Sequence, residues 1–378
     1  MAFPDTDISF QFNPDTKQDV YKSALIYIDD GFISQLQDKG SGIQSAIIIG
    51  LFHFYAREIA HTGSSLLAIE EPELYLHPHG RRIISDRIDD FLEGNKNQVI
   101  ITTHASEFLN SAQENLNIIV VKKDAKNGTT AKNIGFKTAK EKQILIKNQN
   151  TEMFFADLVF LVEGGGDKYI VEALAENYGA KKECLGEKWP NNNNISVIPV
   201  GGKKEFWKYS QKLNEAGIGC YVLADFDFFR DGLSDYLTKL NFTSLKIKHN
   251  TINGKIGSQK NIKKMTDLAN GIKKEIADFI DELKKDNIFI LSGELENYYT
   301  QEAKNVIIGL SGKEERALHI VSQTFEEGND ITKYIIIDEY NAFFDLTSDQ
   351  YLKVKNKDIK KDKATTEDED LTINEIPF

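Results

Sequence analysis

The sequence predicts an α/β protein of two domains, the second of them built on a parallel sheet. Short apolar runs alternate with longer stretches of helical pattern through both halves of the chain, and acidic residues directly follow several of these runs. At 378 residues, with 40% apolar and 28% charged residues, the chain has the length and composition for two soluble domains, each with its own core.

Four apolar runs predict the strands of the second domain. Helical patterns separate the first three runs, and a strand–helix–strand order implies parallel strands joined by right-handed crossovers. Ligands of such sheets bind at the carboxyl ends of the strands. The expected strands are residues 158–162, 195–200, 219–224 and 287–291, and the expected helices are residues 168–178 and 204–216.

Three acidic residues lie at two of these predicted strand ends. Glu163 follows the first strand and precedes a glycine-rich turn, and Asp225 and Asp227 follow the third strand with one residue between them. Carboxylate oxygens suit Mg²⁺ or Mn²⁺, and two such ions could orient the attacking and leaving oxygens of a phosphodiester. Taken singly, each motif is better explained as an ordinary turn or as a helix-start acid favoured by the helix dipole.

Taken together, the two motifs resemble the Toprim pattern, in which one strand ends in Glu-Gly and a later strand ends in Asp-x-Asp. Here Glu163 and Gly164 are about sixty residues ahead of Asp225 and Asp227, and Asp167 fits a further acidic position of the pattern. The resemblance implies a Toprim domain over residues 153–321, with a Rossmann-like parallel sheet. It also implies that these four carboxylates bind metal and that the domain acts on a nucleic-acid phosphate.

Two later motifs resemble the C-terminal parts of the overcoming-lysogenization-defect (OLD) family of nucleases. Residues 291–298, Leu-Ser-Gly-Glu-Leu-Glu-Asn-Tyr, supply Glu294 and Glu296, and Ser311-Gly312 precedes Lys313 at the start of a predicted helix. The resemblance implies that the two glutamates complete a two-metal site and that Lys313 stabilises charge in the transition state. The alternative is that the glutamates are on a helix surface and the lysine is in solvent.

The first half of the chain carries motifs that resemble the C-terminal part of an ABC-type ATPase. An apolar strand, residues 66–69, ends in the paired acids Glu70 and Glu71, as in a Walker B motif, and a second strand ends at His104, in the place of the switch histidine. The resemblance implies that Glu70 holds Mg²⁺ through water and that Glu71 positions the attacking water. It also implies that His104 contacts the γ-phosphate.

A third motif of this half resembles the ABC signature. Ser41, Gly42 and Gln44 open an apolar helix that is expected to end near residues 62–63. In the family this helix start faces the γ-phosphate bound by a partner subunit, and free N–H groups at a helix start suit an anion. The alternative is that Ser41 simply caps a core helix.

The sequence contains no Walker A motif. Glycine–lysine pairs occur at residues 202–203, 254–255 and 312–313, but none is followed by the Ser or Thr that a P-loop needs for Mg²⁺. Three explanations stay open: a truncated gene, a split ATPase completed by another chain, or a relic that only dimerises. We therefore expect ATP to bind only if a partner supplies the P-loop.

Charge and flanking segments complete these expectations. The net charge of −12 argues against a general nucleic-acid coat protein, and two cysteines are too few for a disulfide scaffold. The chain has no signal-peptide pattern and no apolar run long enough to span a membrane, so we expect a cytoplasmic protein. Residues 1–121 form the ATPase part, 122–152 a connector with a hairpin signalled by Asn127-Gly128, and 322–378 an extension with a charged tail.

The leading prediction is a Mg²⁺- or Mn²⁺-dependent DNA endonuclease of the OLD type that serves in phage defence or DNA repair. It would work as a homodimer or with a partner chain that carries the P-loop. The alternative is an inactive regulatory or scaffold subunit that pairs with a complete ATPase. The loop of residues 201–204, Gly-Gly-Lys-Lys, stays open: its amides and lysines fit a DNA phosphate and fit a solvated turn equally well.

Overall fold

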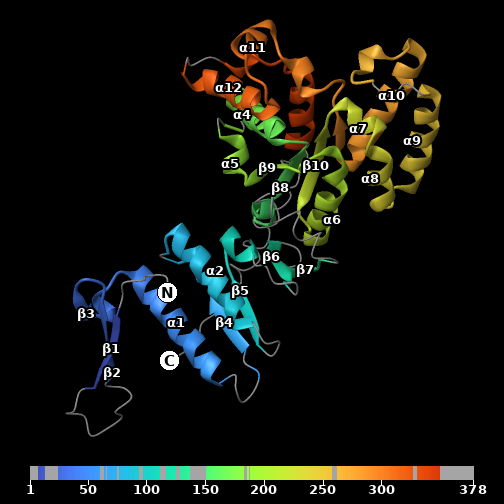
Figure 1. The fold of residues 1–378 in the computed structure, drawn as a ribbon. Coiled ribbons are helices and arrows are strands. Elements are labelled where there is room, and N and C mark those ends of the chain that lie inside the picture. The colour runs from blue at the N-terminus through green and yellow to red at the C-terminus, as the bar shows by residue number, and fades with distance from the viewer. Residues whose placement is uncertain are drawn as a thin grey trace, which may run out of the picture. The chain divides into compact units, whose positions relative to one another are not determined.

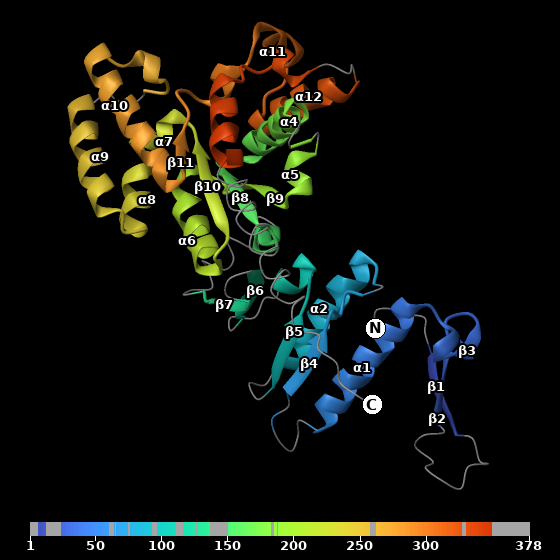
Figure 2. The same ribbon diagram turned by 180° about the vertical axis from the view of Figure 1, so that it is seen from behind.

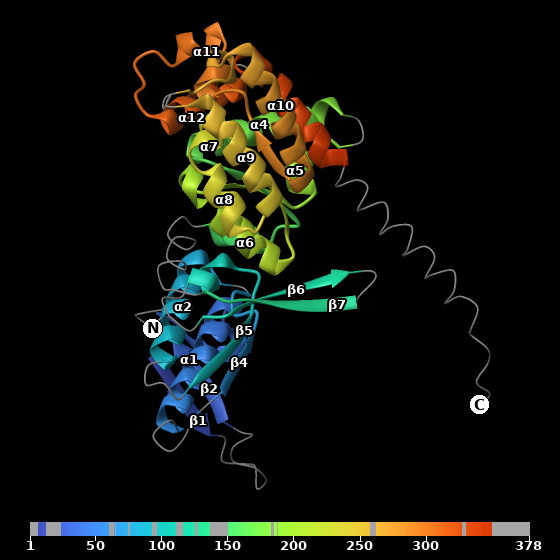
Figure 3. The same ribbon diagram turned by 90° about the vertical axis from the view of Figure 1, so that its right-hand side faces the viewer.

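The computed structural model of this protein divides into two compact units, Met1–Leu116 and Asn117–Phe378, shown from three sides in Figures 1, 2 and 3. Among the described residues, no helix is long and apolar enough to cross a membrane. The structure describes residues 7–12, 24–59, 64, 66–74, 76–92, 97–110, 116–124, 128–136, 150–182, 185–186, 188–257, 262–326 and 330–349.

The first unit contains a parallel strand pair packed against two helices. Helices α1 and α2 lie on one face of the pair (Figure 2). Exposed and half-buried residues alternate along both strands, so their other face is more exposed. A small core forms where α2 meets the segment after the second strand, around Ile84, Ile88 and Phe108. The strands are β4 (Leu66–Glu70) and β5 (Gln98–Thr102), and the helices are α1 (Ser41–Ile59) and α2 (Pro78–Leu92).

A separate antiparallel sheet precedes these elements, with the strand order β1-β2-β3. It is followed by a short 3-10 helix, and another 3-10 helix follows the parallel pair. The bounds are β1 (Asp7–Phe12), β2 (Ala24–Asp29), β3 (Ile33–Gln35), η2 (Leu36–Asp38) and η3 (Ser106–Asn110).

The second unit is built on a four-stranded parallel sheet, as the sequence predicts, and the strand order is β11-β10-β8-β9. Helices cover both faces of the sheet, with α4, α5 and α12 on one side and α6 to α8 on the other (Figures 1 and 3). The central strand β8 is therefore buried along its whole length, which explains its unbroken apolar sequence. The strands are β8 (Leu158–Val162), β9 (Ile195–Pro199), β10 (Gly219–Ala224) and β11 (Ile288–Ile290).

The described helices of this unit fall into three groups along the chain. The first group connects β8, β9 and β10, the second forms an insertion between β10 and β11, and the third follows β11. In chain order they are α4 (Gly165–Lys181), α5 (Trp189–Asn192), α6 (Phe206–Ala216), α7 (Phe226–Arg230), α8 (Leu233–Lys239), α9 (Thr243–Ile256), α10 (Asn270–Leu283), α11 (Gln301–Val306) and α12 (Lys313–Glu326), and residues 338–349 are also helical.

Several element boundaries differ from the prediction by a few residues, and two of these differences matter for the sites. Helix α4 begins at Gly165 and not at residue 168, because the side chain of Asp167 accepts a hydrogen bond from the Gly164 amide (2.9 Å) and caps the helix start. The strand predicted to end at His104 ends at Thr102, where the Glu71 amide donates to its carbonyl (2.8 Å). Both differences concern residues next to the sites described below.

The predicted hairpin exists and belongs to the second unit. Strands β6 (Ile118–Asp124) and β7 (Gly128–Ile134) pair antiparallel around Gly128, whose positive φ of 70° favours glycine. Three other predictions lie outside the described residues: Asn127 of that turn, the expected helix end at residues 62–63, and the charged tail from residue 353.

Candidate active site

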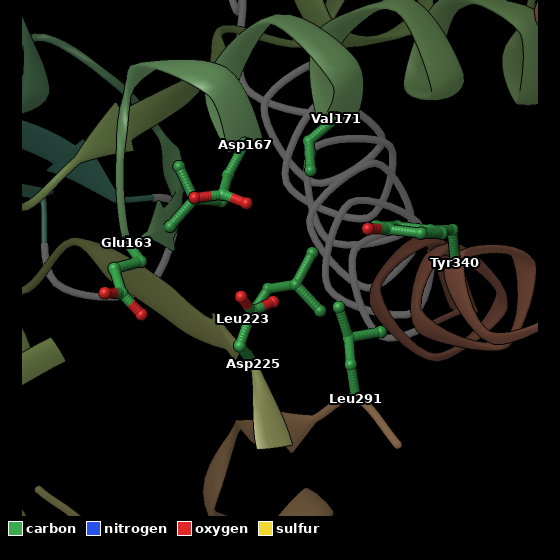
Figure 4. Close-up of a pocket in the computed structure, with 8 residues that line it drawn as sticks. Glu163, Asp167, Val171, Leu223, Asp225, Leu291 and Tyr340 are labelled. Atoms are coloured by element: carbon green, nitrogen blue, oxygen red, sulfur yellow. The ribbon is translucent and has the colours of Figure 1, made fainter. Parts of the chain in front are cut away.

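Three carboxylates meet at the carboxyl ends of β8 and β10. Glu163 directly follows β8, Asp225 directly follows β10, and Asp167 is in the first turn of α4. Figure 4 shows the side chains of Asp167 and Asp225 pointing toward one another across a small pocket, with Glu163 at its edge. The remaining lining residues are Val162, Val171, Leu223, Leu291 and Tyr340.

Burial in this mostly apolar pocket disfavours the charged form of all three acids. It raises the pKa of Asp225 to about 9, of Glu163 to about 7 and of Asp167 to about 6. The neighbouring carboxylates add to the pKa shifts of Asp225 and Glu163, while the positive charge of Lys313 lowers the pKa of all three. The pocket therefore gathers negative charge that only a cation or a proton can neutralise.

Asp227 contacts a lysine at the edge of the same site. It is in the first turn of α7, and its Oδ2 accepts a hydrogen bond from Lys203 Nζ (2.6 Å). Lys203 follows Gly201 and Gly202, whose N–H groups both donate to the carbonyl of Glu163 (3.0 Å each). The two glycine amides are therefore already hydrogen-bonded within the protein. Of the groups in this loop that could bind a phosphate, only the lysines remain available.

The two later motifs, which follow β11 in the chain, also reach this site. Glu294 precedes the short helix η8 (Leu295–Tyr298), and its carboxylate pairs with Lys263 (2.9 Å). Glu296 is on that helix, and its Oε1 is 3.2 Å from Nζ of Lys313, the first residue of α12. The negative charge of Glu296 also contributes to the raised pKa of Asp167, so the structure brings both motifs to the carboxylate pocket.

A close packing of helix starts makes this meeting of motifs possible. A Cβ added to Gly166 would lie 3.2 Å from the backbone carbonyl oxygen of Lys313 and 3.5 Å from the Cβ of Ala317. The glycine therefore lets the start of α12 approach the start of α4. That approach places Lys313 within reach of Glu296.

The donors of the site fit a hard divalent cation, although they are not arranged around one. Among the described residues, no group of three His, Cys, Asp or Glu side chains has the geometry to hold a metal ion. However, Asp227 Oδ1 and Glu296 Oε2 are buried carboxylate oxygens without a hydrogen-bond partner, and such oxygens are costly unless a ligand satisfies them. Carboxylate oxygens are the ligands that Mg²⁺ and Mn²⁺ prefer.

One supporting residue of this site was not predicted from the sequence. Glu339 accepts hydrogen bonds from the Ser292 amide (2.8 Å), the Tyr298 hydroxyl (2.8 Å) and the Ser292 hydroxyl. These bonds fix the turn that carries Glu294 and Glu296. Glu339 comes shortly after the apolar run of residues 335–337, but its distance in sequence from the motif hides the connection.

In the first unit, the structure brings the predicted acid and histidine together. Glu70 ends β4, and Glu71 follows with an unusual positive φ of 43°. Its Oε1 is 3.7 Å from His104 Nε2. Ser41 is the first residue of α1, with Gly42 and Gln44 in the same turn, and the side-chain amide of Gln44 donates to the carbonyl of Lys39 (2.7 Å).

Glu73 supports this acid–histidine pair, although no role for it was predicted from the sequence. Its side chain is 8% exposed, and it accepts hydrogen bonds from the Thr103 hydroxyl (2.8 Å) and from the His104 amide (2.5 Å). Glu73 therefore ties the loop that carries His104 to the end of β4. Its place directly after Glu70-Glu71-Pro72 was the available signal.

Comparison with protein families gives two matches. Residues 4–109 match an AAA ATPase domain. Residues 154–227 match the TOPRIM domain of overcoming-lysogenization-defect-like proteins. The second match begins just before β8 and ends at Asp227, so it contains four of the carboxylates described above.

Curated relatives carry nuclease names. The Old nuclease of Escherichia phage P2 is 28% identical over 88% of this chain and 62% of its own length. Endonuclease GajA of Bacillus cereus (strain HuB5-5) is 27% identical over 76% of this chain and 44% of its own. The OLD nuclease of Thermus scotoductus (strain ATCC 700910 / SA-01) is 28% identical over 43% of this chain and 31% of its own length. The chain thus spans less than two thirds of the relatives it matches.

A solved structure also aligns with this chain at low similarity. The C-terminal region of the Xanthomonas campestris pv. campestris OLD protein is 21% identical, and the alignment covers 55% of this chain and 80% of that one. The TM-score of this alignment is 0.27.

Proposed function

We propose that this OLD-family protein, which joins an AAA ATPase domain to an OLD-like TOPRIM domain, hydrolyses DNA phosphodiesters with the help of divalent metal ions. The observation that carries the proposal is the pocket where Glu163, Asp167 and Asp225 meet beside Lys313. Buried acids that repel one another are unfavourable for folding, and their presence at the ligand end of a parallel sheet favours a function.

Each group of the site has a proposed role. Glu163, Asp167, Asp225 and Asp227 would hold one Mg²⁺ or Mn²⁺, and Glu294 with Glu296 would help to hold a second. When bound, such ions activate water and offset charge on the attacking and leaving oxygens. Lys313 would donate to a non-bridging oxygen of the scissile phosphate, where negative charge grows in the transition state.

A plasmid-cleavage assay with Mg²⁺, Mn²⁺ and Ca²⁺ tests this proposal. The wild type is compared with the Asp225→Ala/Asp227→Ala double variant, and circular dichroism checks that both are folded. We expect metal-dependent nicking or linearisation that the double variant has lost. Equal cleavage by both proteins would show that the site is assigned wrongly.

The role of the first unit is proposed on the same basis. Glu70, Glu71 and His104 would act on ATP together with a P-loop from another chain, and Ser41, Gly42 and Gln44 would face its γ-phosphate. This arrangement requires a homodimer or a partner. A DNA nuclease of this kind suits defence against phage or plasmid DNA, and a plaque assay with wild-type and Asp225→Ala strains tests that role.

A scaffold function is the second candidate, because the site carboxylates are not arranged around a metal in the described part of the chain. In that case the chain would pair with a complete ATPase without cutting DNA. Copurification with such an ATPase, together with unchanged activity of the complex carrying Asp225→Ala, would favour the scaffold. Loss of cleavage in that complex would favour the nuclease.

A further inference from the structure

Three lysines reach the carboxylate site from separate elements, and each pairs with a different acid. Two of them, Lys203 and Lys263, have no role in the reaction proposed above. Lys203 comes from the loop after β9, Lys263 from the insertion between β10 and β11, and Lys313 from the start of α12. The pairs are Lys203 Nζ with Asp227 Oδ2 (2.6 Å), Lys263 Nζ with Glu294 Oε1 (2.9 Å) and Lys313 Nζ with Glu296 Oε1 (3.2 Å).

Backbone hydrogen bonds hold both new lysines at the site. The loop before Lys203 is fixed to the end of β8 by the two glycine amides that donate to the Glu163 carbonyl. The segment after Lys263 is fixed by the Met265 amide, which donates to the carbonyl of Ser292 (2.8 Å). The side chain of Lys263 is 64% exposed and that of Lys203 is 21% exposed, so both border solvent.

Two of the three ion pairs leave room for a cation, whereas Lys263 contacts both oxygens of Glu294 (2.9 and 3.2 Å). Lys203 bonds one oxygen of Asp227, and the other oxygen is buried without a partner. Lys313 and Glu296 repeat this arrangement. A cation can therefore bind the free oxygen of each acid, and it weakens the attraction between that acid and its lysine because it neutralises the carboxylate charge. The ammonium group can then pair with a phosphate oxygen.

The charge of the site shows why such lysines are needed. When all are ionised, the six acids carry six negative charges, of which two divalent cations neutralise four. The remaining two negative charges would repel a phosphodiester. The three lysines change this sum to one positive charge, which attracts it. Asp231, which also contacts Lys203 (3.7 Å), leaves the sum unchanged because Lys204 pairs with it (3.2 Å). The six acids are Glu163, Asp167, Asp225, Asp227, Glu294 and Glu296.

We propose that Lys203 and Lys263 bind phosphate oxygens of the nucleic acid at the metal-loaded site. This inference rests on the proposed nuclease function and extends it to the residues that hold the substrate backbone. Their contribution is electrostatic and independent of base sequence, because a lysine ammonium acts on a phosphate as a point charge and contacts no base.

The test is DNA affinity, measured by fluorescence anisotropy with a labelled duplex in Ca²⁺ over a range of salt concentrations. Lys203→Ala and Lys263→Ala are each expected to weaken binding about tenfold at low salt and to lower the slope of log affinity against log salt by about one. Lys203→Arg keeps the charge and should bind within about threefold of wild type.

Lys181→Ala is the matched control, since it removes the same charge from an exposed ion pair with Asp330 (2.7 Å) at the far end of α4. That end is roughly 25 Å from the site. Wild-type affinity and salt slope in Lys203→Ala and Lys263→Ala, or losses equal to that of Lys181→Ala, would overturn the inference.

A Mn²⁺ titration separates phosphate binding from a role in arranging the acids. Phosphate binding predicts that Lys203→Ala binds Mn²⁺ as tightly as wild type or more tightly, because a repelling positive charge is gone. A Mn²⁺ affinity about tenfold weaker would show instead that Lys203 only orients Asp227. If the wild type neither binds Mn²⁺ nor cuts DNA, the proposed function fails, whereas normal cleavage by both lysine variants contradicts this inference alone.

Discussion

Both units place acids at the carboxyl end of a parallel strand, but the acids differ in their exposure to solvent. In the first unit, Glu71 and His104 are open to solvent, with side chains 36% and 83% exposed. In the second, Asp225 is 9% exposed, and its pocket is enclosed by strand ends, by α4 and by Tyr340. The first site is therefore an exposed surface that can meet another chain, while the second encloses its own charge.

Burial changes what each acid can do. The enclosed acids have raised pKa values, up to about 9 for Asp225, and such acids gain most from a cation. The exposed pair in the first unit is instead held in place by hydrogen bonds from its surroundings, through Glu73. We therefore expect DNA cleavage to depend on the acids of the second unit. Variants in that site should lower cleavage, whereas variants in the first site should change local stability.

The largest expected effect comes from removing Asp225. Asp225→Ala should lower metal-dependent DNA cleavage by roughly a thousandfold or more, because it removes a carboxylate that we propose as a metal ligand. The measurement is the initial rate of plasmid nicking in Mn²⁺. Asp235→Ala, on the exposed side of α8, is the control and should cut like wild type. A comparable loss in Asp235→Ala would point to misfolding.

A smaller effect is expected from the glycines that let α12 approach α4. Gly166→Val places side-chain carbons against the Lys313 carbonyl, so it should cost about 1–3 kcal/mol of stability and lower cleavage by displacing Lys313. Gly165→Ala is the matched comparison, because its Cβ meets only the end of the Glu314 side chain, which can move. Thermal unfolding and cleavage rates that are equal in both variants would contradict this packing argument.

The second sheet and its strand-end acids could be predicted from the sequence because both depend on local patterns. Apolar runs such as residues 158–162 mark a strand buried on both faces, and the residue directly after a strand must lie at its end. Contacts between segments that are distant in the sequence have no local pattern that predicts them. Glu339 fixes Ser292 from 47 residues away, and Lys203 pairs with Asp227 across two elements, so neither contact was predicted.

The arrangement of the site carboxylates could be predicted even less well. Residue types predict a metal site, but side-chain positions depend on the ion pairs with Lys203, Lys263 and Lys313. The start of α4 could not be predicted from the sequence either. A run of glycines predicts a turn by propensity, but the capping bond from Gly164 to Asp167 turns it into a helix start.

The enclosed site should also cost stability when no metal is present. The folded-state pKa of Asp225 is raised to about 9 from its usual 3.8, so the contribution of this group to the stability of the metal-free protein is greatest at low pH and falls as pH rises toward 9. Asp225→Asn removes the charge and should raise the free energy of unfolding by about 1–3 kcal/mol at about pH 8 in EDTA. The gain should shrink at about pH 5. A destabilised Asn variant under the alkaline condition would show that the carboxylate makes a favourable contact.

The smallest expected effect is local to the first unit. Glu73→Gln keeps the shape of the side chain but removes the charge that accepts hydrogen bonds from Thr103 and His104. A hydrogen bond to a charged group contributes about 1.5–3 kcal/mol, and the neutral amide oxygen retains part of it. Hydrogen exchange at the His104 amide should therefore speed up by about tenfold, a change of about 1.4 kcal/mol in local stability.

Glu107→Gln is the control for this variant, since Glu107 is in the same unit and its cationic contact with Arg81 is a distant one (4.0 Å). Exchange at His104 should be unchanged in that control. The metal affinity of the second unit should be unchanged in both variants, because each site is stabilised within its own unit. If Glu73→Gln weakened Mn²⁺ binding by the carboxylate pocket, the two sites would be coupled, and their difference in burial would no longer separate their functions.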